Sequence, residues 1–181
     1  MFKHVMRRLH NALLYGADPN ISPYVVLDNN VVIDRTAKVF HFCVIRENVR
    51  IGEGSVIGHN VVVERDTKIG KNTTIQSQCH ITANAVIGDN VFIGPGVTTM
   101  NEKVIANNGR AVPKIEQLVI EKGARVGAGA TIAPGVTIGA NAFVKANSFV
   151  TKNIPAGEVW GCRNGFAKAV RLGDVPVEEY L

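Results

Sequence analysis

Several residue types are scarce in this sequence, and their scarcity limits what the chain can be. Only three cysteines occur, Cys43, Cys79 and Cys162, without CxxC spacing, which argues against a disulfide framework or a structural zinc site. No stretch reaches the roughly 18 apolar residues of a membrane span, and the N-terminus lacks the uninterrupted apolar region of a secretory signal. We therefore expect a reduced, cytoplasmic protein without a membrane span.

Aromatic residues make up only 6% of the chain and charged residues 19%, with a formal net charge of +5. A basic protein suits anionic partners, but no run of basic residues occurs, and aromatic side chains for stacking on bases are few. Nucleic acid is therefore not an expected partner, and small molecules that carry phosphate are favoured instead.

A six-residue repeat dominates the rest of the sequence, because every sixth residue from 21 to 93 is Ile, Leu or Val. The members are Ile21, Leu27, Ile33, Val39, Ile45, Ile51, Ile57, Val63, Ile69, Ile75, Ile81, Ile87 and Ile93. The pattern resumes with Ile120, Val126, Ile132, Ile138, Val144 and Val150. A fixed short period indicates a repeat architecture.

Each hexad has the features of one short strand and one turn. The residue two places before the aliphatic is small or β-branched, as at Val49 and Ser55, and turn formers such as Gly52 and Gly58 follow the aliphatic. Side chains alternate along a strand, so the small or β-branched residue and the aliphatic point inward, and the residue between them points outward. Such short strands bury their faces only by stacking, which predicts a parallel β-solenoid.

Hexads such as SVIGHN, AVIGDN and VFIGPG resemble the repeat of the left-handed parallel β-helix acyltransferases, over about residues 21–160. In that family three hexads form one triangular coil, so we expect an all-β prism of about six coils, roughly 30 Å long. The predicted divisions are an N-terminal amphipathic helix (1–20), coils (21–99), an extruded loop (100–118), further coils (119–157) and a C-terminal tail (158–181).

The segments outside the repeat carry weaker signals. The apolar stripe of the N-terminal helix comprises Phe2, Val5, Met6, Leu9 and Leu13. We expect this helix to cap the open end of the core; a basic helix resting on an anionic membrane surface is the alternative. The loop lacks the six-residue pattern, and long connections are often functional. In the tail, residues 166–171 are predicted to form one or two helical turns.

Assigning the hexads to three faces separates a polar face from an apolar one. The apolar face has the outward residues Tyr24, Val26, Phe42, Val44, Asn60, Val62, Gln78 and His80. An exposed apolar stripe of this kind requires cover, so we expect a subunit interface there. The resemblance agrees, because members of that family are typically homotrimers of side-by-side prisms.

The segment ARVGAGATIAPGVTIGANAFVKANSFVTKNIPAG resembles the C-terminal coils of transferases that use acetyl-CoA as co-substrate. There the donor lies in the groove between neighbouring prisms, where small residues let its pantetheine arm approach the backbone, and cations bind its phosphates. The small residues implied here are Gly127, Ala128, Ala133 and Ala146, and the cations are Lys152, Lys168 and Arg171. The small residues are alternatively only solenoid turns.

The segment that ends in GPGVTTMNE most resembles the nucleotide-sugar N-acetyltransferases, in which an Asn before the extruded loop lies near the transfer site. Asn101 matches that Asn. His80, outward on the apolar face, is a candidate general base, because an imidazole titrates near neutral pH; it is alternatively an interface histidine without a chemical role. The predicted function is acetyl transfer from acetyl-CoA to the amino group of an amino sugar, and the resemblance implies that this sugar is linked to a nucleotide.

Other functions stay open. O-acetylation of a saccharide or small alcohol uses the same fold and donor but requires a general base. A metal protein similar to the γ-class carbonic anhydrases would use His41, His59 and His80, but their spacing does not fit that class, and we expect no metal. A non-catalytic solenoid is the remaining possibility. The sequence has no Ser-His-Asp set, P-loop or Rossmann motif, and the cysteines at inward positions argue against a thiol nucleophile.

Overall fold

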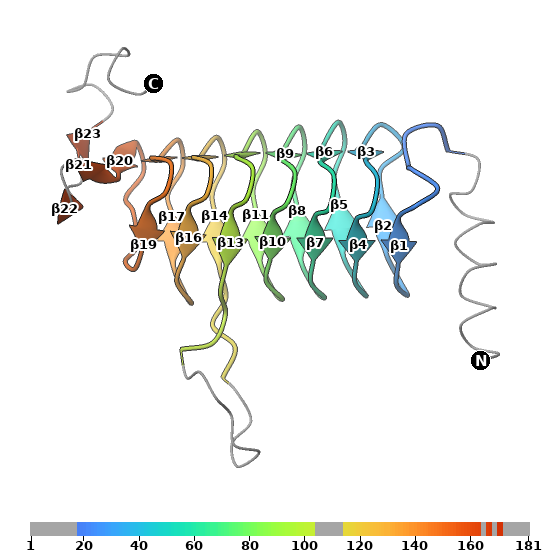
Figure 1. The fold of residues 1–181 in the computed structure, drawn as a ribbon, viewed down its shortest axis with the longest axis horizontal. Helices are drawn as coiled ribbons and strands as arrows, with labels where there is room; N and C mark the ends of the chain where they lie inside the picture. The colour runs from blue at the N-terminus through green and yellow to red at the C-terminus, as the bar shows by residue number, and fades with distance from the viewer. Residues whose placement is uncertain (1–17, 104–113, 164–165, 168–169, 172–181) are drawn as a thin grey trace.

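The computed structural model describes residues 18–103, 114–163, 166–167 and 170–171, and these form a three-sided parallel β-solenoid. Figure 1 shows its coils stacked along one axis, from the N-terminal coils at one end to the C-terminal coils at the other. The predicted hexapeptide-type β-helix is confirmed. The N-terminal helix expected over 1–20 lies almost wholly outside the described residues.

Each side of the prism is one sheet. Sheet 1 consists of β1 (Val26–Leu27), β4 (Val44–Ile45), β7 (Val62–Val63), β10 (His80–Ile81), β13 (Thr98–Thr99), β16 (Thr131–Ile132) and β19 (Phe149–Val150). Sheet 2 consists of β2 (Val32–Ile33), β5 (Arg50–Ile51), β8 (Lys68–Ile69), β11 (Val86–Ile87), β14 (Val119–Ile120) and β17 (Thr137–Ile138). Sheet 3 consists of β3 (Lys38–Val39), β6 (Val56–Ile57), β9 (Thr74–Ile75), β12 (Phe92–Ile93), β15 (Arg125–Val126), β18 (Phe143–Val144), β20 (Glu158–Trp160) and β23 (Val170–Arg171).

The strand register stacks the aliphatic series into the core. Leu27 lies opposite Ile45, and Ile45 opposite Val63, so equivalent residues of successive coils are parallel partners. All members of the series from Ile21 to Val150 are buried, while the residue before each aliphatic points outward. Burial of these side chains, each worth about 1.5–3 kcal/mol, holds the coils together.

The solenoid is longer than the six coils expected, because the repeat continues where the aliphatic series stops. Thr99 takes the inward position of the series in β13, and Sheet 1 has seven strands. At the far end Trp160 pairs with Val144 and packs against the core. The six-residue pattern hides these two members, because neither Thr nor Trp is an aliphatic.

The long insertion leaves the coil register intact. Ile87 lies opposite Ile120, 33 residues later by number, so the chain between them completes one coil and adds the loop. Residues 104–113 of that loop lie outside the described part. At its base, Glu102 and Ile115 form an antiparallel bridge.

The C-terminal prediction over 166–171 is wrong in type. In place of helical turns the chain forms β22 (Phe166–Ala167), which pairs antiparallel with β21 (Cys162–Arg163), and β23, which pairs antiparallel with β20. Backbone pairing to the last coil outweighs the weak local helix preference here. Among the described residues no helix is long and apolar enough to cross a membrane.

The chain turns sharply at three edges, two of which border Sheet 1. We name the first edge as the corner from Sheet 3 to Sheet 1, residues 22–24, 40–42, 58–60, 76–78, 94–96, 127–129 and 145–147. The second edge is the corner from Sheet 1 to Sheet 2, residues 28–30, 46–48, 64–66, 82–84, 133–135 and 151–153, and the long loop leaves the prism from this edge.

Candidate active site

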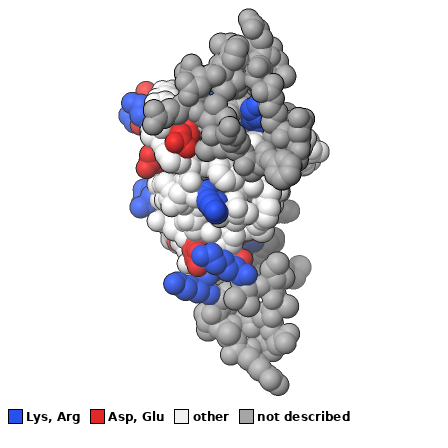
Figure 2. Space-filling view, turned by 90° about the vertical axis from the view of Figure 1, so that its left-hand side faces the viewer, with Lys and Arg blue, Asp and Glu red and all other residues white. Residues whose placement is uncertain are grey.

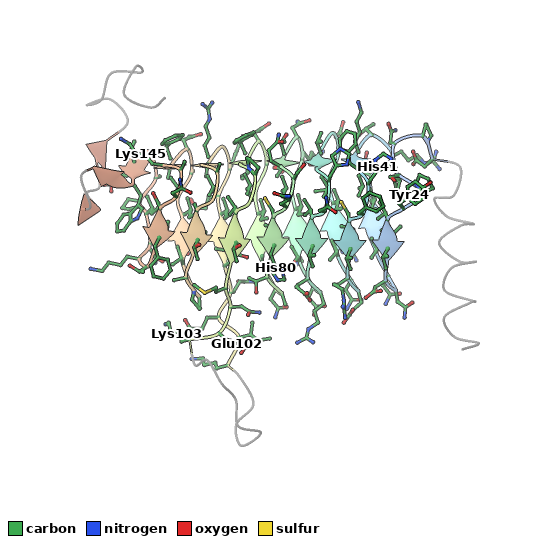
Figure 3. The ribbon with its side chains drawn as sticks, in the orientation of Figure 1. Tyr24, His41, His80, Glu102, Lys103 and Lys145 are labelled. Atoms are coloured by element: carbon green, nitrogen blue, oxygen red, sulfur yellow. The ribbon has the colours of Figure 1, made fainter. Side chains whose placement is uncertain are left out.

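His80 lies near the middle of Sheet 1 with its side chain exposed to solvent (Figure 3). Its backbone is held on one side of the strand, because the His80 N–H donates to the Val97 carbonyl at 3.0 Å. Its carbonyl accepts a hydrogen bond from the Thr99 hydroxyl at 3.2 Å. The imidazole is therefore mounted on a fixed strand and free to meet a ligand.

Thr99 explains how the sheet is held where the loop departs. Its buried hydroxyl, besides donating to His80, accepts the backbone N–H of Thr82 at 2.8 Å. In the preceding coil the equivalent bond runs to a backbone carbonyl, from Glu64 N–H to Ile81 O at 2.9 Å. Thr99, at an inward position of the series, thus bonds to His80 in β10 and to Thr82, the residue that follows β10.

Asn101 follows β13 at the second edge, and the base of the loop fixes its backbone. The Asn101 carbonyl accepts the N–H of Glu116 at 2.8 Å, and Lys103 Nζ lies 2.6 Å from Glu116 Oε2. Figure 3 places Glu102 and Lys103 at this base. Because Glu116 on the returning limb bonds to both Asn101 and Lys103 on the outgoing limb, the backbone of Asn101 occupies a defined position.

His80 and Asn101 belong to adjacent strands. His80 lies opposite Thr98, and Asn101 comes three residues after Thr98, at most about 11 Å of chain away. The structure therefore brings the two predicted catalytic residues near each other. His80 lies on the face of Sheet 1, and Asn101 lies at the second edge beside it.

The residues predicted to bind the donor divide between two edges. Gly127, Ala128 and Ala146 lie in consecutive coils of the first edge, whereas Ala133 and Lys152 lie in consecutive coils of the second. Both edges border Sheet 1, where β16 is two strands from His80, about 10 Å. One donor molecule along one edge of one chain would not contact the whole set.

The first edge has a bare backbone in these coils because the coils approach closely. A Cβ at Gly127 would lie 2.8 Å from both Ala146 Cα and the Lys145 carbonyl carbon, so only glycine fits there without a shift of the chain. The small side chain of Ala146 leaves the next corner open as well, and that residue is exposed. A flexible arm lying along this edge would reach backbone groups directly.

Lys145 is a further candidate for binding the donor phosphates, and it is not among the cations predicted from the sequence. It stands at the corner position that holds Gly127 in the preceding coil and Gly161 in the following one. Its side chain lies over Gly161, where a Cβ would come within 2.5 Å of Lys145 Cβ and 2.8 Å of Cδ. The sequence contains a signal for it, because a lysine stands here at a corner position that is glycine in both neighbouring coils.

The charge of Lys145 is not used elsewhere in the described part of the chain, where no carboxylate forms an ion pair with it. Figure 3 places it at the C-terminal end of the solenoid, and Figure 2, which looks onto that end, shows the described charged side chains against a largely uncharged surface. Lys152 is exposed, Lys168 lies outside the described residues, and of Arg171 the structure describes only the pairing of β23 with β20.

The buried thiols have structural partners. Cys43 donates to the Gly58 carbonyl at 2.8 Å and Cys79 to the Gly94 carbonyl at 3.1 Å, as Ser55 does to Gly70 at 2.7 Å. Burial raises the pKa of both thiols, which disfavours the thiolate that a nucleophile requires.

The histidines of the first edge stack and do not converge. The rings of His41 and His59 have centroids 5.4 Å apart at an interplanar angle of 15°. Parallel rings direct their nitrogen atoms side by side, and the described residues contain no group of three His, Cys, Asp or Glu that could hold a metal.

The exposed apolar residues of Sheet 1 lie toward its two ends. Tyr24 and Phe42 are each 61% exposed and Val26 54% at the N-terminal end, and Phe149 of β19 is 56% exposed at the other, while the outward positions of β10, β13 and β16 are His80, Thr98 and Thr131. Exposed large apolar side chains in contiguous strands are typical of a surface that binds a partner.

Comparisons with known proteins agree with this architecture. The family model "Bacterial transferase hexapeptide (six repeats)" matches residues 30–65, 66–100 and 118–152. A comparison with curated proteins finds no match.

Solved structures similar to this chain include a protein from Bacillus cereus assigned as an acetyltransferase, with 24% identity, TM-score 0.65, and coverage of 89% of this chain and 87% of that one. A hexapeptide-repeat acetyltransferase from Vibrio cholerae, complexed with acetyl-CoA, is 27% identical with TM-score 0.58, covering 67% and 69%. The GDP-perosamine N-acetyltransferase of Caulobacter crescentus, with CoA and GDP-perosamine, is 20% identical with TM-score 0.56, covering 90% and 65%.

The family match covers more than half of the chain and includes the strands that carry His80 and the bare corners around Gly127. By its repeat, its coil register and this match, the chain belongs to the bacterial hexapeptide transferase family.

Proposed function

We propose that this protein transfers the acetyl group of acetyl-CoA to the amino group of a nucleotide-linked amino sugar. The observation that carries the proposal is the open first edge at Gly127, Ala128 and Ala146, which leads to Sheet 1 two strands from the exposed His80. The acetyl-CoA complex of the similar Vibrio cholerae acetyltransferase supports the donor, and the GDP-perosamine complex of the Caulobacter crescentus enzyme supports the acceptor class.

In the proposed reaction the acceptor nitrogen attacks the thioester carbonyl carbon. The new C–N bond forms, the C–S bond breaks, and the sulfur leaves as the thiol of CoA with a proton. His80 accepts the proton that the amine loses, and Asn101 orients the amine. Holding both reactants on one surface removes much of the cost of a bimolecular encounter.

The donor phosphates require cations, and Lys145 is the described residue best placed for them. Its ammonium lies at the C-terminal end of the first edge, next to Ala146 and without an ion pair among described residues. Lys152 lies on the second edge. In a homotrimer, covered along the apolar part of Sheet 1, edges of two neighbouring chains would together form each donor groove.

The first experiment is a thermal-shift measurement with acetyl-CoA, since a ligand at 100 times its Kd stabilises by about 2.7 kcal/mol. His80→Ala is then assayed with an amino-sugar acceptor, and we expect kcat/KM to fall about 100-fold or more. Arg50→Ala is the control, because Arg50 is likewise exposed and outward but on Sheet 2. Unchanged turnover of His80→Ala across the pH range would remove His80 from the mechanism.

O-acetylation of a saccharide is the second candidate, and the exposed imidazole of His80 is the observation in its favour. A hydroxyl keeps its proton at neutral pH, so an alcohol acceptor depends on a base more strongly than an amine does. Parallel assays with amino and hydroxyl acceptors decide between the two reactions. Activity with alcohols alone, abolished in His80→Ala, would establish O-acetylation.

A further inference from the structure

A hollow of about 610 Å³ lies at the N-terminal end of the first edge, lined by residues 18–23 and 38–41. Its volume falls within the range of small-molecule sites, about 300–1,000 Å³. Neither His80 nor the donor residues line it. The hollow is thus a feature that the acetyl-transfer chemistry leaves unexplained.

One wall of the hollow is aromatic and is held in place by ring contacts. Phe40 lies 5.1 Å from His59, centroid to centroid, and His41 is stacked between Tyr24 at 5.8 Å and His59 at 5.4 Å. Phe40 is nevertheless 38% exposed, and His41 is exposed as well. The exposed ring of Phe40 therefore offers a surface that is already oriented before a ligand arrives, whereas His41, stacked between two rings, presents its edge.

The rest of the lining, residues 18–23, runs beside β3 and is held by hydrogen bonds. Asn20 Nδ2 donates to the Arg35 carbonyl at 3.0 Å, and the Asn20 N–H donates to Asp18 Oδ1 at 2.8 Å. The Ser22 N–H donates to the Val39 carbonyl at 2.9 Å, which fastens this segment to β3. The backbone beside the aromatic residues is therefore fixed.

Lys38 adds a positive charge to the lining. It is the outward residue of β3, it is exposed, and it forms no ion pair with a described residue. Oriented rings beside a cation match a planar heteroaromatic ring that carries phosphate. Stacking on aromatic side chains tolerates every base, whereas the charge selects the phosphate.

The position of the hollow indicates whether it suits the nucleotide of the donor, acetyl-CoA, or the nucleotide of the acceptor. Along the first edge His41 is five coils from Ala146, roughly 24 Å, so the hollow is remote from the donor corners. It is only two coils, about 10 Å along the axis, from the coil of His80. A nucleoside diphosphate can bridge that separation and leave its sugar at His80.

We propose that this hollow binds the nucleoside diphosphate portion of the acceptor, with the base stacked on Phe40 and hydrogen-bonded to the edge of His41, and a phosphate on Lys38. The inference rests on the proposed function and deepens it, because it states where the nucleotide of a nucleotide-linked sugar is held. It also separates recognition of the acceptor from the transfer chemistry, which takes place two coils away.

The test is calorimetric titration of the full chain with UDP, dTDP and GDP, with the corresponding nucleosides and with pyrophosphate, all without acetyl-CoA. We expect at least one nucleoside diphosphate to bind. Phe40→Leu should weaken that binding about tenfold, the size of a lost stacking contact, and His41→Ala about tenfold, the size of a lost hydrogen bond. Lys38→Gln should weaken the diphosphate and leave the nucleoside unchanged.

The controls are Phe92→Leu, which changes another exposed outward aromatic of Sheet 3, and Lys68→Gln, which changes an exposed outward lysine of Sheet 2. Thermal midpoints measured without ligand identify any variant that fails to fold. If Phe40→Leu fails to fold, Lys38→Gln still tests the inference, because it changes an exposed side chain. Absence of nucleotide binding, or equal weakening by the controls, overturns the inference. Acetyl-CoA binding in the same samples reports separately on the proposed function.

Discussion

The two ends of the first edge use the same backbone for opposite purposes. At the N-terminal end its corners carry Tyr24, His41 and His59, whose rings contact one another. At the C-terminal end the corresponding corners carry Gly127 and Ala128, which expose the main chain. The hexad fixes the path of the chain, and the corner side chains decide whether a ligand meets rings or amides.

The backbone angles make this equivalence concrete. Phe42 has φ of 63° and Gly129, at the same corner position four coils later, has φ of 66°. Glycine adopts this left-handed conformation freely, but for a bulky aromatic it costs roughly 1–2 kcal/mol. The N-terminal end therefore keeps an exposed ring at an energetic cost that the C-terminal end avoids.

The largest effect is expected where the coils are closest. In Gly127→Ala the new Cβ meets Ala146 and Lys145 backbone atoms, and overpacking of this kind costs about 2 kcal/mol. Chemical denaturation measures the loss in unfolding free energy. Ala128→Gly, at the next corner residue, should not crowd the neighbouring coil and serves as the control. An unchanged denaturation midpoint in Gly127→Ala would contradict the close approach.

Lys145 adds a positive charge to the C-terminal end of the first edge, where Gly127 and Ala128 expose the main chain. Lys145→Ala should weaken acetyl-CoA binding about tenfold, the loss of one charge-assisted hydrogen bond, and leave S-acetylpantetheine unaffected because that donor lacks the nucleotide. Titration calorimetry with both donors measures the difference. Lys68→Ala, which changes an exposed lysine of Sheet 2, is the matched control. Equal losses with both donors would assign Lys145 a packing role instead.

Phe42 tests the cost of the ring at the opposite end. Phe42→Asn places at this corner the residue found at Asn60 and Asn147, which adopt the same left-handed φ. Relief of backbone strain should raise the unfolding free energy by about 1 kcal/mol. The measurement is denaturation at low protein concentration. A decrease would mean that packing of the exposed ring, for example against a second chain, outweighs its strain.

The smallest effect concerns the thiols beneath the edge. Burial raises the pKa of Cys43 and Cys79, so less thiolate forms at neutral pH, and the reactivity of the folded chain should be low. In a Cys162→Ser background, a thiol reagent at pH 7.5 should modify neither cysteine until denaturant is added. Rapid modification of the native protein would show that the coils open locally.

The sequence was sufficient for the prism because its core repeats with a fixed period. Ile45, Ile57 and Ile81 occupy the inward positions that the period predicts. The period could not identify Thr99 or Trp160, because their inward placement follows from the register of neighbouring strands and not from their own chemistry.

The candidate site was less accessible to prediction, because its residues are grouped by coil geometry. His80 was predicted to point outward on Sheet 1 and does. The donor residues are predicted to line a groove between two prisms, and Gly127 and Ala133, six residues apart, lie on different edges, so two chains must contribute to such a groove. Lys145 and the rings around His41 become informative only when residues one coil apart are compared side by side.

Each coil of this solenoid contacts only the coils next to it, so no common core ties the two ends together. In evolutionary terms such a chain is modular. A relative can replace its N-terminal coils by a join at any coil boundary while its C-terminal coils keep their packing. If the hollow binds the acceptor as proposed, substrate range changes by exchange of whole coils, without redesign of the coils around His80.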